Sequence, residues 1–286
     1  MAASQKQYVM KTTMIKTIGT AFLFAGMITL NSCNKDKSAS DFTAADNQAL
    51  ADETYNDVHN VSDEASQTGS VSYKDEDANS LLSGCAVVTR DTISAIRTTT
   101  IDFGTGCTGI DGKTRKGKIL ISYDGPYRAQ GTTITVTFQD FFVNDNQVLG
   151  TKTIHNDGLN GAGNPSFSIH VQGQIILANN AGTIIWTSDR TREWIAGAAT
   201  PQRDDDQYSI TGTASGTDSE GNPFTCTIVD PLIRNLAPGC RRHFVKGSVL
   251  IQRSGKPDKS IDFGNGDCDN QAVVTVNGTS HIINLH

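Results

Sequence analysis

The stretch GTTITVTFQDFFVNDNQVLGTKTIH at 131–155 indicates the fold class of this chain. Between Thr133 and Phe138, apolar side chains alternate with threonines, so the two kinds of side chain point to opposite faces of a β-strand. The tripeptide Asn-Asp-Asn at 144–146 is typical of a turn, and the residues after it are again extended in pattern. The stretch therefore predicts two neighbouring antiparallel strands.

The same pattern continues from Cys85 to the end of the chain. Segments rich in Thr, Val, Ile and Phe are separated by Gly or Asn at intervals of about ten residues, and Asn277-Gly278 is a strong hairpin signal. No helical period lies between them, whereas parallel strands would need crossover connections. The sequence therefore predicts a mainly β protein with residues 85–286 in an antiparallel meandering sheet, either a sandwich or a curved half-barrel.

The N-terminus resembles an export signal. Three lysines precede an apolar stretch at 18–30, which is too short to span a bilayer comfortably. The following Leu-Asn-Ser-Cys at 30–33 resembles the lipobox of bacterial lipoproteins. We therefore expect residues 1–32 to be a signal peptide and Cys33 to carry the lipid. The true start codon stays open among Met1, Met10 and Met14.

Residues 33–84 differ from the rest in charge, because they hold three lysines against eleven Asp and Glu residues. Apolar residues recur at helical spacing between about 44 and 64. This segment is interpreted as a lipid-anchored acidic tether with one helix. The acidic balance argues against a nucleic-acid partner, which requires a basic face.

A motif occurs twice in the β region, as IDFGTGC at 101–107 and IDFGNGDC at 261–268. Each copy follows a Gly-Cys pair and a strand, with Cys85 before the first copy and Cys240 before the second. An exported protein can keep disulfides, and glycines allow the tight turn that brings the second cysteine back.

The repeat predicts two disulfides, Cys85–Cys107 and Cys240–Cys268, each closing the ends of a hairpin. In the chain-entropy model such loops contribute about 3 kcal/mol each. Cys226 is left over and is interpreted as a buried, inert thiol.

The second copy also contains oxygen-bearing side chains in a calcium-like spacing: Asp262, Asn265, Asp267 and Asp269. The first copy lacks the partner acids. Asp and Asn favour turns for backbone reasons alone, and the turn explanation is preferred. No metal or other cofactor is expected.

No catalytic motif is present: the sequence has no nucleophile elbow, P-loop, HExxH or paired zinc cysteines. The six histidines are scattered and are interpreted as polar residues on strand faces. A triad or a pair of carboxylates assembled in three dimensions remains open. The sequence favours a protein that is not an enzyme.

The segment TIIWTSDRTREW at 183–194 carries the most informative side chains. Strand alternation places four of them on one face: Trp186, Arg190, Arg192 and Trp194. They could form a platform for a glycan or an anionic polymer. The alternative, which is preferred, is a ladder of cation–π contacts and ion pairs that covers the sheet.

These motifs together resemble a group of uncharacterised lipoproteins of Gram-negative bacteria. The resemblance rests on the lipobox, the acidic helix, both IDFG copies, DGKTRKGKI at 111–119, TSDRTREWIAG at 187–197 and ITGTASG at 210–216. It implies attachment to the cell envelope and no particular activity. Asn34 after Cys33 resembles the pattern that permits passage to the outer membrane, and periplasmic or surface orientation stays open.

The functional expectation is a membrane-anchored, non-enzymatic β module that binds a glycan or a protein. Two alternatives remain: a periplasmic, glycan-directed hydrolase, or a carrier of lipids or lipoproteins with a half-barrel sheet. A carrier would need a large apolar concave face, and a glycan binder would need exposed aromatic side chains.

Overall fold

The computed structural model describes residues 42–67, 80–82, 84–91 and 93–285. The predicted signal peptide and Cys33 lie outside the described residues. The elements are α1 (Thr43–Gln67), β1 (Val87–Asp91), β2 (Arg97–Asp102), β3 (Cys107–Thr108), β4 (Thr114–Tyr123), β5 (Thr133–Val143), β6 (Asn146–Leu159), β7 (Pro165–Ile176), a short 3₁₀ turn (Ala178–Asn180), β8 (Thr183–Ala196), β9 (Gln207–Thr217), β10 (Pro223–Asn235), β11 (Phe244–Gln252), β12 (Lys259–Asn265), β13 (Gln271–Val276) and β14 (Thr279–Asn284).

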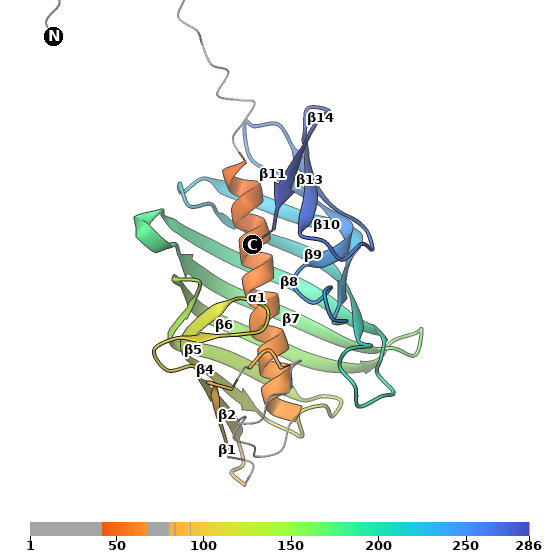
Figure 1. Cartoon of the computed structure of the whole chain (residues 1–286). Helices are drawn as coiled ribbons and strands as arrows, with labels where there is room; N and C mark the ends of the chain where they lie inside the picture. The colour runs from red at the N-terminus through yellow and green to blue at the C-terminus, as the bar shows by residue number, and fades with distance from the viewer. Residues whose placement is uncertain (1–41, 68–79, 83, 92, 286) are drawn as a thin grey trace, which may run out of the picture. The chain divides into compact units, whose positions relative to one another are not determined.

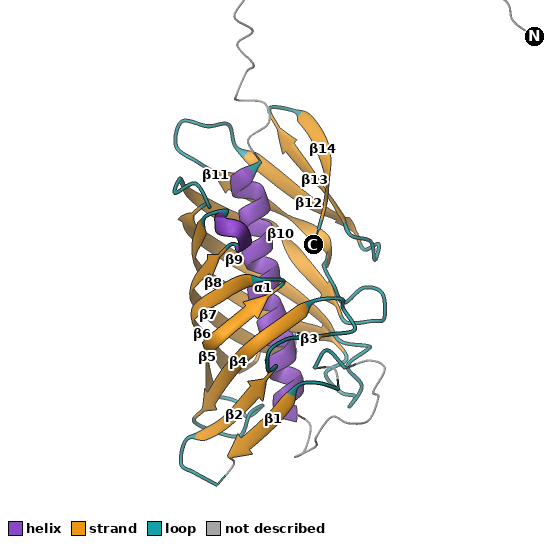
Figure 2. Cartoon of the chain, turned by 60° about the vertical axis from the view of Figure 1, so that its left-hand side comes forward, coloured by secondary structure: helices purple, strands orange, loops and turns teal. Residues whose placement is uncertain are grey.

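All strands belong to one antiparallel sheet, so the predicted mainly β fold is confirmed. The strands follow one another in the order of the chain, from β1 at one edge to β14 at the other, and the short β3 pairs beside β4. Of the two predicted forms, the curved open sheet is found and the sandwich is not, because all the strands in the described ranges belong to this one sheet. The sheet bends around α1, which runs across its concave face (Figures 1 and 2).

The predicted helix at 44–64 is present and slightly longer, but its assignment to an external tether is wrong. Its sequence contains several alanines and neither Gly nor Pro, which suits a helix. Between residues 43 and 66, only Asp46 is exposed, and the other side chains are buried or half-buried. The helix is therefore part of the folded body, because the sheet supplies partners for its polar side chains.

Tyr55 holds the middle of α1 against the sheet. Its ring stacks on Trp186 of β8 at 5.3 Å between centroids. Its hydroxyl donates to the carbonyl oxygen of Leu149 at 2.9 Å. Directly beneath lies Gly173 of β7, where an added Cβ would stand 2.0 Å from the tyrosine hydroxyl. A glycine is therefore needed at this position for the helix to approach the strand.

The doubled IDFG motif builds the same local structure at 101–104 and 261–264. In each copy the Ile and the Phe are buried in the core. The Asp points outward and accepts a hydrogen bond from the amide of the Gly two residues later, at 2.9 Å in the first copy and 2.8 Å in the second. Both glycines have positive φ, so the motif ends a strand in a tight turn toward the second cysteine.

Both predicted disulfides are present in the structure. Cys85 bonds to Cys107 with 5.6 Å between Cα atoms, and Cys240 bonds to Cys268 with 4.5 Å. Cys226 is free and buried, and burial raises the pKa of its thiol to about 12. The thiolate is the reactive form of cysteine, so this group is inert at neutral pH.

Candidate functional site

Basic side chains of the sheet project onto the buried helix. They are at most 7 % exposed and come from four strands: Arg115, Lys152, Arg190, Arg192 and Arg234. The helix faces them with three buried acids: Asp52, Glu53 and Asp57. A charge removed from water must be paired or it costs several kcal/mol. The interior between α1 and the sheet is therefore held together by charge pairing as well as by apolar contact.

Arg115 is the most completely buried member of this network. Its guanidinium donates to Asp57 of α1 at 3.0 Å and to Asp111 at 3.2 Å, and its side chain is fully buried. Burial raises the pKa of Asp57, but the nearby positive charges of Arg115, Lys113 and Arg234 together hold that pKa below the usual range. This contact ties the helix to the start of β4.

Glu53 forms a second pairing one turn earlier in α1. Lys113 approaches it at 3.0 Å and His243 at 3.2 Å, and all three side chains are buried. Burial raises the pKa of Glu53, but Lys113 and His243 together lower it below its usual range. Since His243 comes from the far half of the sheet, the helix bridges strands that are distant in the sequence.

The predicted platform on β8 is also part of this interior. The four side chains share one face, as the alternation predicted: Trp186, Arg190, Arg192 and Trp194. They are between 2 % and 7 % exposed, because α1 and the neighbouring loops cover them. The possible ligand platform at these residues is therefore not open to solvent.

Each end of that row has a structural contact. At one end, Trp186 donates its indole N–H to Gln48 at 2.9 Å, and Arg190 pairs with Asp52 at 3.1 Å. At the other end, the guanidinium of Arg192 lies 3.6 Å from the ring centroid of Tyr208. The row is thus the ladder of ion pairs and cation–π contacts that the sequence offered as the alternative.

Lys152 of β6 is a further buried basic group of this interior. Its ammonium donates to the carbonyl oxygen of Tyr55 at 2.7 Å. Burial lowers its pKa to about 7, and the neighbouring positive charge of Arg192 adds to the shift. The folded protein therefore releases a proton from this side chain near neutral pH, which the unfolded chain does not.

This difference predicts a pH dependence of stability. Between pH 7 and about 10.5 the unfolded chain binds more protons at Lys152 than the folded protein does, so the free energy of unfolding rises with pH across that window. Urea unfolding at several pH values measures the slope. Lys152→Met should flatten it, whereas Met in place of the exposed Lys246 should leave it unchanged. A slope that survives Lys152→Met would contradict this assignment.

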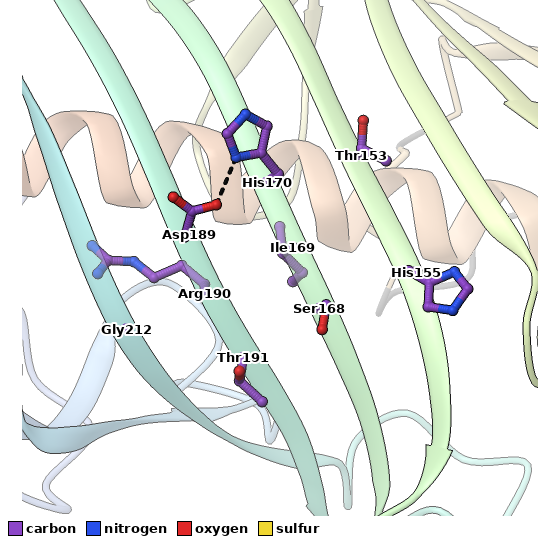
Figure 3. Close-up of a pocket in the computed structure, with 9 residues that line it drawn as sticks. All are labelled: Thr153, His155, Ser168, Ile169, His170, Asp189, Arg190, Thr191 and Gly212. Atoms are coloured by element: carbon purple, nitrogen blue, oxygen red, sulfur yellow. Dashed lines mark hydrogen bonds and ion pairs between the residues drawn. The ribbon is translucent and has the colours of Figure 1, made fainter.

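The outer face of the sheet, opposite α1, holds a shallow polar pocket of about 360 Å³ (Figure 3). It spans β6 to β9 and is lined by Thr153, His155, Ser168, Ile169, His170, Asp189, Arg190, Thr191 and Gly212. Register brings the outward side chains together, since Thr153 pairs with His170, and His170 in turn pairs with Asp189. The pocket is thus a consequence of strand pairing.

A histidine–carboxylate pair forms the centre of this pocket. Nδ1 of His170 lies 2.7 Å from Oδ1 of Asp189; the Asp189 side chain is exposed and that of His170 is half-buried. This contact orients the imidazole and leaves Nε2 directed away from the carboxylate (Figure 3). His155 contacts the Thr133 hydroxyl through its Nδ1 at 3.2 Å. The pocket therefore offers ring nitrogens, a carboxylate and hydroxyls to a polar ligand.

The pocket is lined by hydrogen-bonding side chains, but the serine hydroxyl in it is not positioned as a nucleophile. Ser168 lines the pocket, but its hydroxyl donates to Asp157 at 2.8 Å. A triad would require that hydroxyl on the imidazole. The arrangement in the structure therefore suits binding more than hydrolysis.

Two of the four residues in the calcium-like spacing accept backbone amides in turns. Asp262 accepts the amide of Gly264 at 2.8 Å, and Asp269 accepts the amide of Gln271 at 3.0 Å. Within the described ranges, no three His, Cys, Asp or Glu side chains converge in a way that could hold a metal ion. The preferred explanation of these acids as turn residues thus agrees with their contacts.

Sequence reasoning did not single out His170 and Asp189, although a signal for them exists. The sequence Asn-Asn-Ala-Gly at 179–182 is typical of a turn, and counting back from it along both strands places the two residues opposite each other. The sequence did not show the register in which β6 pairs with β7. This register places Thr153 and His155 of β6 beside His170.

Comparison of the chain with protein-family models, with curated proteins and with solved structures finds no match. Among the helices that the structure describes, none is both long and apolar enough to cross a bilayer.

Proposed function

We propose that this chain is a lipid-anchored, non-enzymatic binding module of the bacterial cell envelope, and that it binds a hydroxyl-rich ligand such as a glycan in the outer pocket. The pocket carries the proposal, because it combines a volume of about 360 Å³ with a histidine–carboxylate pair and several hydroxyl groups. Ligand sites typically join a concavity of this size to a few polar groups that fix orientation.

The chemistry of the pocket favours a neutral, hydroxyl-rich partner. Asp189 is paired with His170, so the pocket presents no strong excess of either charge. Thr153, Ser168 and Thr191 add donors and acceptors at strand spacing. A sugar ring likewise presents donors and acceptors in a regular array. Hydrogen bonding would replace the aromatic stacking that the buried tryptophans cannot supply.

The envelope location rests on four supporting features. The lysine-rich start, the apolar stretch and the lipobox at 30–33 resemble bacterial lipoproteins. Two disulfides suit an oxidising compartment. The membrane partner would then be reached through the lipid on Cys33. Periplasmic and surface-facing orientations are both compatible with this proposal.

The alternatives have less support from the contacts. A lipid carrier would use the concave face, and that face is filled by α1 and its charge pairs. A hydrolase would use an activated nucleophile or two free carboxylates, and the buried acids of α1 are paired with basic groups.

Two substitutions test the pocket. His170→Ala and Asp189→Ala should each leave the free energy of unfolding within about 0.5–1 kcal/mol of wild type, because both side chains are accessible. Both should weaken binding to a glycan selected on an array of bacterial envelope polysaccharides, as measured by calorimetry. Thr227→Ala is the matched control, since Thr227 is exposed on the same face outside the pocket. Equal binding by all three variants would overturn the assignment.

The anchor is tested separately. Cys33→Ala should release the protein from the membrane fraction or block its maturation, because the thiol would accept the diacylglyceryl group. Retention of a metabolically incorporated lipid label by Cys33→Ala would show that the lipobox interpretation is wrong.

A further inference from the structure

The last strand, β14, is a sheet edge that lacks the usual protection. It pairs only with β13 among the described strands. Its sequence TSHIIN contains no Lys, Arg, Asp, Glu or Pro, and its pairing with β13 runs over six residues without a register shift. Proteins usually blunt such edges with charges, prolines or bulges, because unpaired backbone groups recruit other strands.

The opposite edge differs in this respect. β1 carries the charged Arg90 and Asp91 near its end. Arg90 also donates through its guanidinium to the carbonyl oxygen of Ala65 in α1. The contrast identifies β14 as the edge that is chemically open to pairing.

A groove accompanies this edge on the outer face of the sheet. Register places Asp262, Val273 and Ile282 in one row across β12, β13 and β14. Ile282 is 67 % exposed and Val273 is 37 % exposed. Asp267 and Asp269 complete the lining of a depression of about 140 Å³. An apolar strip beside the edge is thus bordered by three acids.

We propose that β14 and this groove form a strand-addition site for an extended partner segment in which apolar and basic side chains alternate. The backbone of the partner would pair with β14, an apolar side chain would cover Ile282, and basic side chains would approach the acids. In a strand, alternate residues face the same side, so such a segment presents its apolar and basic side chains in a regular order.

The charge balance favours a different protein over a second copy of this chain. The chain has a formal net charge of −6, so two copies repel each other on approach. Pairing of β14 with itself would also add no positive charge opposite the acidic border. A basic segment supplies that charge and thereby gains both attraction and orientation.

A synthetic probe tests the proposal on the purified full chain. We expect a short fluorescent peptide with alternating Lys and Val to bind saturably, as measured by fluorescence anisotropy. The same peptide with Glu in place of Lys should bind at least tenfold more weakly. N-methylation of the peptide amides that face β14 should abolish binding, because strand addition depends on backbone hydrogen bonds.

Two variants locate the contact. Ile282→Lys should weaken the binding of the Lys–Val peptide at least tenfold, because it places a like charge at the edge. Val229→Lys is the matched control, since Val229 is 60 % exposed on the central strand β10. Equal binding by wild type and Ile282→Lys, absence of saturable binding, or a dimer of the chain with protected β14 amides would each overturn the proposal. None of these outcomes depends on glycan binding in the outer pocket.

Discussion

Arg115→Met is expected to lower the free energy of unfolding by about 3 to 5 kcal/mol, which is the usual cost of removing one partner from a buried ion pair. The guanidinium of Arg115 contacts two carboxylates, those of Asp57 and Asp111, and all three side chains are nearly excluded from solvent. Methionine fills a similar volume but takes the guanidinium away from both buried carboxylates, and Asp57 then keeps the more distant Lys113, at 3.9 Å.

The neighbouring residue on β4 provides the control for this prediction. Lys116 pairs with Asp145, but both groups are accessible, and exposed ion pairs contribute about 0–1 kcal/mol. Urea unfolding followed by circular dichroism should therefore show a large loss for Arg115→Met and little change for Lys116→Met. Similar losses for the two variants would mean that the buried pair does not hold α1 in place.

Gly173→Val is expected to destabilise the protein by at least about 3 kcal/mol, at the upper end for overpacking. The first carbon of the new side chain would meet the hydroxyl oxygen of Tyr55 at 2.0 Å and its ring at 2.3 Å. The Tyr55 ring is fixed by its stacking on Trp186 and by the hydrogen bond from its hydroxyl to the carbonyl oxygen of Leu149. The helix must therefore shift. Denaturant unfolding measures the loss.

A control and a coupled variant make this test specific to the helix. Gly161 has open space around its Cβ position, so Gly161→Val should change stability by about 0.5 kcal/mol or less. In a protein that already carries Tyr55→Ala, Gly173→Val should cost much less than in wild type, because the clash is gone. If the losses in unfolding free energy from Gly173→Val and Tyr55→Ala were additive, the close contact between these two positions would be contradicted.

The sheet could be predicted because its signals are local. Alternation between Thr133 and Phe138 specified a strand without knowledge of its neighbours. The hairpin signal at 277–278 specified antiparallel pairing in the same way. The two cysteine pairs followed from a repeat, which is visible in sequence and needs no three-dimensional information. The choice between a sandwich and one curved sheet was not decided, because curvature depends on what the sheet encloses.

The placement of α1 could not be predicted because its partners are remote. Asp57 and Arg115 are 58 residues apart, and neither looks unusual in its own segment. A helix with acids on several faces normally lies in water, and the counter-charges that bury this one are distributed over several strands. The same gap left the role of Trp186 and Arg192 open between a platform and a ladder: alternation showed that they share a face, but only the fold shows that α1 covers it.

Hydrogen exchange at the amides of α1 tests the central claim most directly, namely that this polar helix is an integral part of the core. If α1 is held by its charge pairs and by Tyr55, then amides at 50–62 exchange only when the sheet itself unfolds, as slowly as those of β6 to β8. Exchange of these helix amides many times faster than exchange in β6 to β8 would contradict the account, because it would show that the helix leaves the sheet while the sheet stays folded.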